Sequence, residues 1–200
     1  MITLPWWLAA VLGAGLALLW PPGRGRRRIQ TTRHGVGPLV HRRYWIDVVG
    51  AQADPAAVLA ELRDHFAEHV PSRAANFKKS RGRPERTRAG DEFGVLMTGA
   101  RPAAVRVVEA RPHTFRLASL EGHPEAGDIR FSVAPRGPDR FRFAIESHAR
   151  SDAPSSRLLY QLGGSKVQQR VWASVCREVL RLSGGRAPGG VQVQTQEEEA

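Results

Sequence analysis

Apolar and polar residues alternate through the middle of the chain, and this alternation predicts a run of short β-strands. Odd-numbered positions are mostly apolar, whereas even-numbered positions carry charges such as Arg106, Arg130 and Glu146. Turn residues, for example Gly122-His123-Pro124, separate the segments, and such short links join antiparallel strands. One face of this sheet should therefore be buried and the other solvated. The predicted strands are Glu92–Thr98, Ala103–Ala110, Thr114–Leu120, Asp128–Ala134 and Arg140–His148.

A strand and a helix are predicted before this meander. In Val40–Val49, the even positions Tyr44, Ile46 and Val48 are apolar. Asp54-Pro55 then provides a helix cap and a first-turn proline. The apolar stripe of this helix consists of Val58, Leu59, Leu62, Phe66 and Val70, and Pro71 ends it.

The last predicted element is a long helix over Ser155–Leu182, loosened at Gly163-Gly164. Its apolar side is expected to cover the apolar face of the sheet. Gln168 falls near the middle of that apolar side, and a buried amide needs hydrogen-bond partners. It either bonds the backbone or points into a cavity. The tail after the helix is polar, ends in Glu197–Glu199 and is expected to be disordered.

An uninterrupted apolar run, Leu4–Trp20, opens the chain and predicts a transmembrane helix. The alternative is a cleaved signal peptide, but residues 1–5 contain no Lys or Arg and no small-residue cleavage site follows. The nearby basic residues all follow the run, and basic flanks stay in the cytoplasm. We therefore expect a single-pass protein of the cell membrane whose remaining residues are cytoplasmic. A lone cysteine, Cys176, agrees with a reducing compartment.

The formal net charge of +11 over 200 residues suggests an anionic partner. Beside an anchor, the anionic inner leaflet is the expected partner. Nucleic acid is not expected, because neither basic cluster carries interleaved aromatic residues. The second cluster, Arg73–Arg88, can also be read as a solvated loop. The residues predicted to meet the membrane surface are Arg26, Arg27, Arg28, Lys78, Lys79, Arg81 and Arg83.

The order strand, helix, antiparallel meander and long C-terminal helix resembles the START-like superfamily, also called Bet v 1-like or SRPBCC. The segment Gly122-His123-Pro124-Glu125-Ala126-Gly127 resembles the GHPE-x-G turn of an uncharacterised bacterial family in that class. The resemblance implies an α+β helix-grip fold, an antiparallel sheet wrapped around the long C-terminal helix. It also implies that ligands of such relatives, often lipids or other apolar molecules, lie between sheet and helix. It implies no specific activity.

The sequence carries little sign of catalysis, and we predict neither a cofactor nor a metal site. His65 and His69 have a chelating spacing but no evident third ligand. Cys176 falls on the apolar side of the last helix, as expected of an inert thiol. His123 and Glu125 are the best candidates for an acid–base pair. Their alternative role is to shape the turn, with Glu125 paired to an arginine.

Four parts are therefore expected: an anchor at 1–23, a basic juxtamembrane linker at 24–39, a START-like domain at 40–184 and a disordered acidic tail at 185–200. The leading hypothesis is a membrane-anchored domain that binds an apolar or amphipathic small molecule or lipid. The alternatives are a scaffold with a filled core, acting through protein contacts with partners left open, and an enzyme using His123 and Glu125. The predicted ligand-binding residues are Val95, Met97, Phe115, Leu117, Phe131, Phe143, Gln168, Trp172 and Val175.

Overall fold

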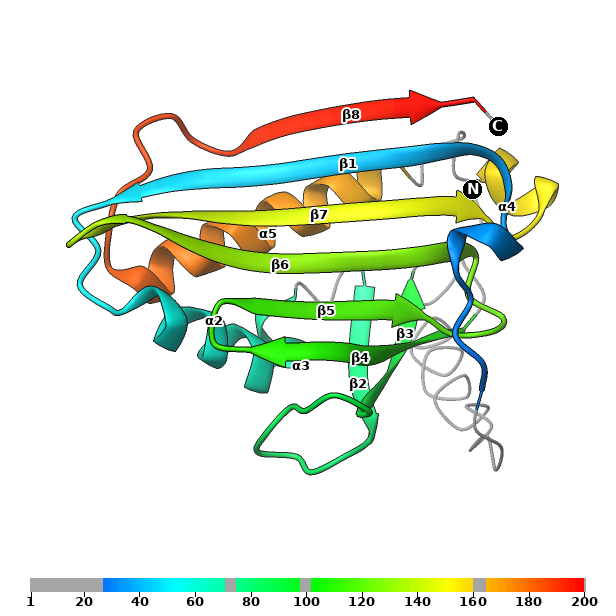
Figure 1. Cartoon of the computed structure of the whole chain (residues 1–200), viewed down its shortest axis with the longest axis horizontal. Coiled ribbons are helices and arrows are strands. Elements are labelled where there is room, and N and C mark those ends of the chain that lie inside the picture. Colours follow the sequence, from blue (N-terminus) through cyan, green and yellow to red (C-terminus); the bar gives the residue numbers. More distant parts are fainter. Residues whose placement is uncertain (1–26, 71–74, 98–101, 160–164, 200) are drawn as a thin grey trace, which may run out of the picture.

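The computed structural model describes residues 27–70, 75–97, 102–159 and 165–199. Its strands are β1 (Val36–Val49), β2 (Ala75–Arg81), β3 (Glu92–Met97), β4 (Ala103–Arg111), β5 (Thr114–Ser119), β6 (Glu125–Gly137), β7 (Arg140–Ser151) and β8 (Gln192–Glu198). Its helices are the 3-10 turn η1 (Thr32–His34), α2 (Pro55–Asp64), α3 (Phe66–His69), α4 (Pro154–Leu159) and α5 (Ser165–Ser183). The strands form one antiparallel sheet in the order β2-β3-β4-β5-β6-β7-β1-β8 (Figure 1).

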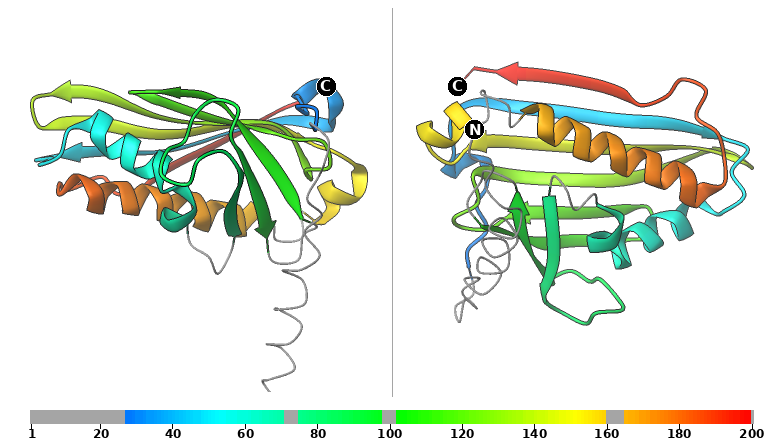
Figure 2. Two further views of the ribbon diagram at one scale, coloured as in Figure 1. Left: turned by 90° about the horizontal axis from the view of Figure 1, so that it is seen from below. Right: turned by 180° about the vertical axis from the view of Figure 1, so that it is seen from behind.

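Helices α2, α3 and α5 cover one face of this sheet (Figure 2). The predicted parity is confirmed in the described strands: odd positions of β3 to β7 and even positions of β1 supply the buried side chains of that face. The helix predicted at Asp54-Pro55 is also confirmed, because the Asp54 carboxylate accepts hydrogen bonds from the amides of Ala56 and Ala57 at 2.9 and 3.0 Å. A break at His65 divides this helix into α2 and α3.

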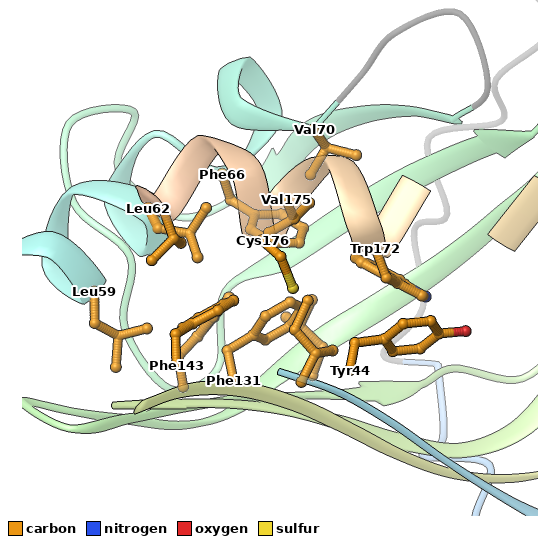
Figure 3. Close-up of a cluster of buried hydrophobic side chains, with 14 of the residues drawn as sticks. Tyr44, Leu59, Leu62, Phe66, Val70, Phe131, Phe143, Trp172, Val175 and Cys176 are labelled. Atoms are coloured by element: carbon orange, nitrogen blue, oxygen red, sulfur yellow. The ribbon is translucent and has the colours of Figure 1, made fainter. Parts of the chain in front are cut away.

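Phe66 lies at the centre of the core between the helices and the sheet. Its ring centroid is 5.1 to 5.8 Å from those of four other phenylalanines, all in edge-on contact. Phe66 is fully buried, and Phe131 in turn contacts Trp172 of α5 at 5.6 Å. Figure 3 shows this cluster between the helices and the strands. Aromatic packing therefore fills the middle of the space between sheet and helices.

Two predictions about the ends of the sheet were wrong. The acidic tail contains strand β8, which pairs with β1 from Leu39↔Glu198 to Trp45↔Gln192. Its Val-Gln-Val-Gln-Thr sequence alternates with period two, and it satisfies the backbone groups along one edge of β1. The expected basic loop also contains a strand, β2, because Ala75 and Phe77 alternate with polar residues and face the core.

The described residues include only part of the predicted N-terminal anchor and linker, from residue 27 onward. Among residues 27–70, 75–97, 102–159 and 165–199, no helix has the length and apolar character needed to cross a bilayer. The predicted anchor at 1–23 lies outside these ranges. The predicted linker differs from the structure where it is described, since residues 27–35 bond to the domain and β1 begins at Val36.

Phe66→Ala should lower the free energy of unfolding by about 3–5 kcal/mol, because it removes a ring that touches four others. Urea denaturation of the full chain, followed by circular dichroism, measures this loss. Val193→Ala in β8 is the control and should change stability by less than about 0.5 kcal/mol, since Val193 is 40% exposed. Equal losses from the two substitutions would contradict the packing described above.

Candidate functional site

Side chains on the helix-covered face of the sheet become smaller toward one end of α5. Three neighbouring cross-strand rows follow from the strand register. The first row is Phe115, Phe131, Ile145 and Tyr44. The second is Leu117, Ile129, Ser147 and Arg42, and the third includes Gly127, Ala149 and Val40. Bulky aromatic packing thus gives way to small and polar residues, and we call this region the polar end of the grip.

Arg42 is a charged residue on the buried, mainly apolar face of the sheet. It has the same parity as Tyr44 and is only 5% exposed. Its guanidinium Nη1 lies 3.8 Å from Oε1 of Glu125. Sequence reasoning misses this residue because it falls within the basic cluster Arg24–Arg43 that follows the predicted anchor. The alternation of Tyr44, Ile46 and Val48, extended two residues back, would have placed Arg42 on the buried face.

Glu125 joins the sheet to the long helix. Nε2 of Gln168 donates a hydrogen bond to Oε2 of Glu125 at 3.0 Å. The amide of Gln168, which lies on the apolar side of the helix, therefore has a hydrogen-bond partner in a side chain of β6. Trp172, one turn further along α5, packs on Phe131. The helix thus passes from the aromatic core at Trp172 to the polar end at Gln168.

Two buried donors have no hydrogen-bond partner among the described residues: the hydroxyl of Ser147 at the polar end, and the indole Nε1 of Trp172 where the aromatic core borders it. Trp172 is 7% exposed and Ser147 is 6% exposed. The hydroxyl of Tyr44 and the indole nitrogen of Trp172 point the same way (Figure 3). Burial raises the pKa of Tyr44 to about 12, so it stays a protonated donor at neutral pH. An unpaired buried donor carries a desolvation cost that a ligand acceptor would remove.

His123 shapes the turn that carries Glu125. Its Nδ1 accepts a hydrogen bond from the amide of Glu125 at 3.0 Å, and the ring is buried. The preceding Gly122 has a φ of +91°, which favours glycine. The side chain of Gln30 closes the turn by bonding the amide of Gly122 and the carbonyl of His123. This arrangement makes His123 a positioning residue for Glu125.

The apolar residues predicted to line the ligand site belong to one buried core cluster, as far as their side chains are described. Val95, Phe115, Leu117, Phe131, Phe143 and Val175 are buried there, together with Trp172. Met97 ends strand β3, at the limit of the described residues. Cys176 is buried beside Val175, as expected.

The outer face of the sheet carries paired charges, as the alternation predicted. Glu146 pairs with Arg43 and Arg130, and Arg142 pairs with Asp47. Glu146 is therefore engaged on the opposite face from Glu125. No group of three metal-ligating side chains occurs within the described ranges. His69 instead contacts the carboxylates of Glu178 and Glu61, at 2.8 and 3.3 Å.

Comparison with known proteins identifies the family. A family model described as "Domain of unknown function (DUF1990)" matches residues 30–178. The chain belongs to the DUF1990 family. No curated protein matches its sequence.

Solved structures show the fold of this DUF1990 domain. It is similar to a conserved protein of Geobacillus kaustophilus (TM-score 0.52, 8% identity, 77% of this chain and 99% of that chain covered). Norcoclaurine synthase of Thalictrum flavum gives a TM-score of 0.51 at 13% identity, with 80% and 94% covered. A hypothetical protein of Helicobacter pylori gives 0.52 at 16%, with 70% and 86% covered. The helix-grip fold implied by the START-like resemblance is therefore confirmed, whereas the GHPE-x-G turn as a family signature stays a prediction.

Cys176 should be unreactive in the folded chain. Burial raises the pKa of its thiol to about 12, so almost no thiolate forms at pH 8. A thiol-specific chromogenic disulfide should label the folded chain at least a hundred times more slowly than the chain in guanidinium chloride. Rapid stoichiometric labelling of the folded chain would contradict the burial of this helix face.

The double substitution Arg42→Met with Glu125→Gln should change the free energy of unfolding by less than about 1 kcal/mol. A buried ion pair replaced by neutral side chains of similar shape is often neutral for stability, because desolvation offsets the attraction. The amide oxygen introduced at position 125 can still accept from Gln168. Urea denaturation checks this expectation, and a loss of 3 kcal/mol or more would assign the pair a purely structural role.

Proposed function

We propose that this protein binds an amphipathic small molecule or lipid, with an acidic head group at the polar end of the grip. The observation that carries the proposal is a pair of buried donors that lack a hydrogen-bond partner in the described parts of the chain, Ser147 Oγ and Trp172 Nε1. Ser147 pairs across the strands with the inward-facing Arg42. Ligand sites in proteins are mostly apolar with a few placed polar groups, and the polar end has this composition.

The charge of Arg42 favours an anionic head group. A guanidinium keeps its charge at all relevant pH values and carries five N–H donors, so it can serve Glu125 and a ligand together. A carboxylate or phosphate accepts from such donors in short, strong hydrogen bonds. The indole of Trp172 and the hydroxyl of Ser147 would add two further donors to the same acceptor group.

The apolar part of the ligand would lie along the second and third rows, where the side chains of Ser147 and Ala149 are smaller than those of the aromatic first row. Phe131 and Trp172 would limit how deeply it reaches. Norcoclaurine synthase, which has the same fold, has been solved in complex with dopamine and hydroxybenzaldehyde. That complex shows that a protein of this fold binds small molecules. The acidic head group proposed for this chain follows from Arg42, Trp172 and Ser147.

A second candidate is a scaffold that acts through protein contacts. It is favoured by the aromatic packing around Phe66, since many residues predicted to line a cavity are 2% exposed or less. The two candidates differ in what they predict at the polar end, because only the ligand-binding candidate places an acceptor group beside Trp172 and Ser147. Catalysis by His123 and Glu125 is not favoured, because the His123 ring is used by the turn.

The proposed location is the inner face of the cell membrane. It follows from the apolar run Leu4–Trp20 and from the basic residues after it. A ligand with an apolar tail is abundant at that place. The acidic head and the membrane location are separate parts of the proposal.

The first experiment is native mass spectrometry of the full chain in nanodiscs, with lipid analysis of any released molecule and titration of decanoate and decanol. Decanoate should bind with one-to-one stoichiometry and more tightly than decanol. The Arg42→Met, Glu125→Gln variant should bind decanoate about 10- to 100-fold more weakly, because hydrogen bonds to a charged group contribute about 1.5–3 kcal/mol.

The matched control replaces an outer-face ion pair, Arg130→Met with Glu146→Gln, and should bind decanoate like the natural chain. An empty protein that binds neither decanoate nor any released lipid would favour the scaffold. Equal weakening by both double variants would remove the polar end as the site.

A further inference from the structure

The two basic segments of the sequence meet on one side of the molecule. Arg106 Nη2 donates to the carbonyl of Arg27 at 2.8 Å and to Oε1 of Glu92 at 2.7 Å. Arg81, at the end of β2, lies 3.9 Å from the same carboxylate oxygen. Residues more than fifty positions apart in the sequence are therefore connected through the Arg106–Glu92 pair.

The N-terminal segment is held in place and does not act as a free linker. The carbonyl of Arg28 accepts from the amide of Glu121 at 2.9 Å. The amide of Gln30 donates to Ser119, and its carbonyl accepts from Gly127 at 2.9 Å. These bonds tie the segment to the turn that carries His123 and Glu125. The apolar run ends at Trp20, so only a short connection separates a membrane anchor from this fixed segment.

The loop between β2 and β3 is also held in place, by one partly buried ammonium group. Nζ of Lys79 donates to the carbonyls of Arg83 and Arg86 at 2.9 and 3.0 Å and to the hydroxyl of Thr87 at 2.8 Å. The carboxylate of Asp64 accepts from the amide of Thr87 at 2.9 Å. Lys79 therefore serves the loop interior, which corrects its prediction as a membrane-surface residue. Its bonds turn the backbone inward and leave the arginine side chains exposed.

We propose that these two segments form one preshaped surface that docks on an anionic lipid bilayer. The inference rests on the proposed membrane location and does not depend on the ligand. The surface consists of Arg27, Arg28, Lys78, Arg81, Arg83, Arg86 and Arg88. Clustered basic residues near an anionic leaflet each strengthen association about five-fold. Because the loop is already ordered, little conformational entropy is lost on docking.

The chemistry of the surface favours lipid over nucleic acid. The segments 27–35 and 82–91 contain no Phe, Tyr or Trp on which bases could stack. Arg81, at the start of this loop, is linked through Glu92 and Arg106 to Arg27, at the end of the chain that leads to the predicted anchor. A short tether would bring this surface to the bilayer and keep it there, which raises its effective concentration.

The test measures the distance of the loop from the bilayer in the full chain. Pro84→Cys at the loop tip carries a fluorescent donor, and the unreactive Cys176 can remain. The nanodiscs contain an acceptor-labelled lipid in phosphatidylcholine, with or without 30% phosphatidylglycerol. Energy transfer should be at least two-fold higher in the anionic discs and should fall to the neutral-disc value in 0.5 M NaCl, because salt screens exposed charges.

Charge reversal identifies the residues. Arg83→Glu, Arg86→Glu and Arg88→Glu together should abolish the dependence on anionic lipid. The matched control reverses three exposed arginines elsewhere, Arg136, Arg170 and Arg177, and should retain it. Equal transfer in the two disc types, or equal loss in both triple variants, would overturn the proposal, as would tight single-stranded DNA binding without a lipid effect.

Alkaline extraction of vesicles tests the anchor separately. If alkaline extraction removes the chain from neutral vesicles, the anchor prediction fails. If energy transfer still depends on anionic lipid, the docking surface is nevertheless supported. A chain that resists extraction without lipid-dependent transfer would keep the anchor and refute the surface.

Discussion

Burial of the apolar face of the sheet is the constraint on which the rest of this structure depends. Alternate residues of seven strands point to that face, and it must be covered by helices. Helices α2, α3 and α5 meet this need, with Phe66 and Val175 fully buried between the layers. The same alternation sends Arg130, Glu146 and Arg142 to the outer face, where they form cross-strand ion pairs. A shift of one residue in any strand would exchange these two sets, so the register is strongly specified.

The polar end of the grip departs from this pattern in a specific way. Arg42 has the parity of a core residue and is nearly as buried as its neighbours, yet it is charged. Glu125 of β6 pairs with Arg42 and accepts a hydrogen bond from Gln168 of α5. The turn before β6 fixes Glu125 through His123 and Gln30. A buried ion pair gives little stability compared with apolar packing. Such a departure at the end of a well-packed face is where a functional site is expected.

Much of this fold could be predicted from the sequence, because strand parity and helix capping are local signals. The strands from β3 to β7, and the cap at Asp54, are examples. Charge obscured the rest. Strand β2 was predicted as a loop because Lys78 and Lys79 interrupt the alternation of Ala75 and Phe77. Strand β8 was predicted as a disordered tail because it ends in Glu197–Glu199. Arg42 was hidden in the same way. The Gln168–Glu125 bond could not be predicted, because it depends on how α5 lies across the sheet. The anchor stays a prediction.

The proposed binding of an acidic head group at the polar end is tested most directly by NMR of the ¹⁵N-labelled full chain in nanodiscs. The indole resonance of Trp172 is assigned with the Trp172→Phe variant. The indole N–H is buried and has no hydrogen-bond partner within residues 27–70, 75–97, 102–159 and 165–199, so an acidic head group that accepts from it should move the resonance. On addition of decanoate, Trp172 should shift in proportion to occupancy, while Trp45 on the outer face should not. Binding of decanoate that leaves Trp172 unchanged, or that shifts Trp45 instead, would contradict the assignment of the polar end as the ligand site.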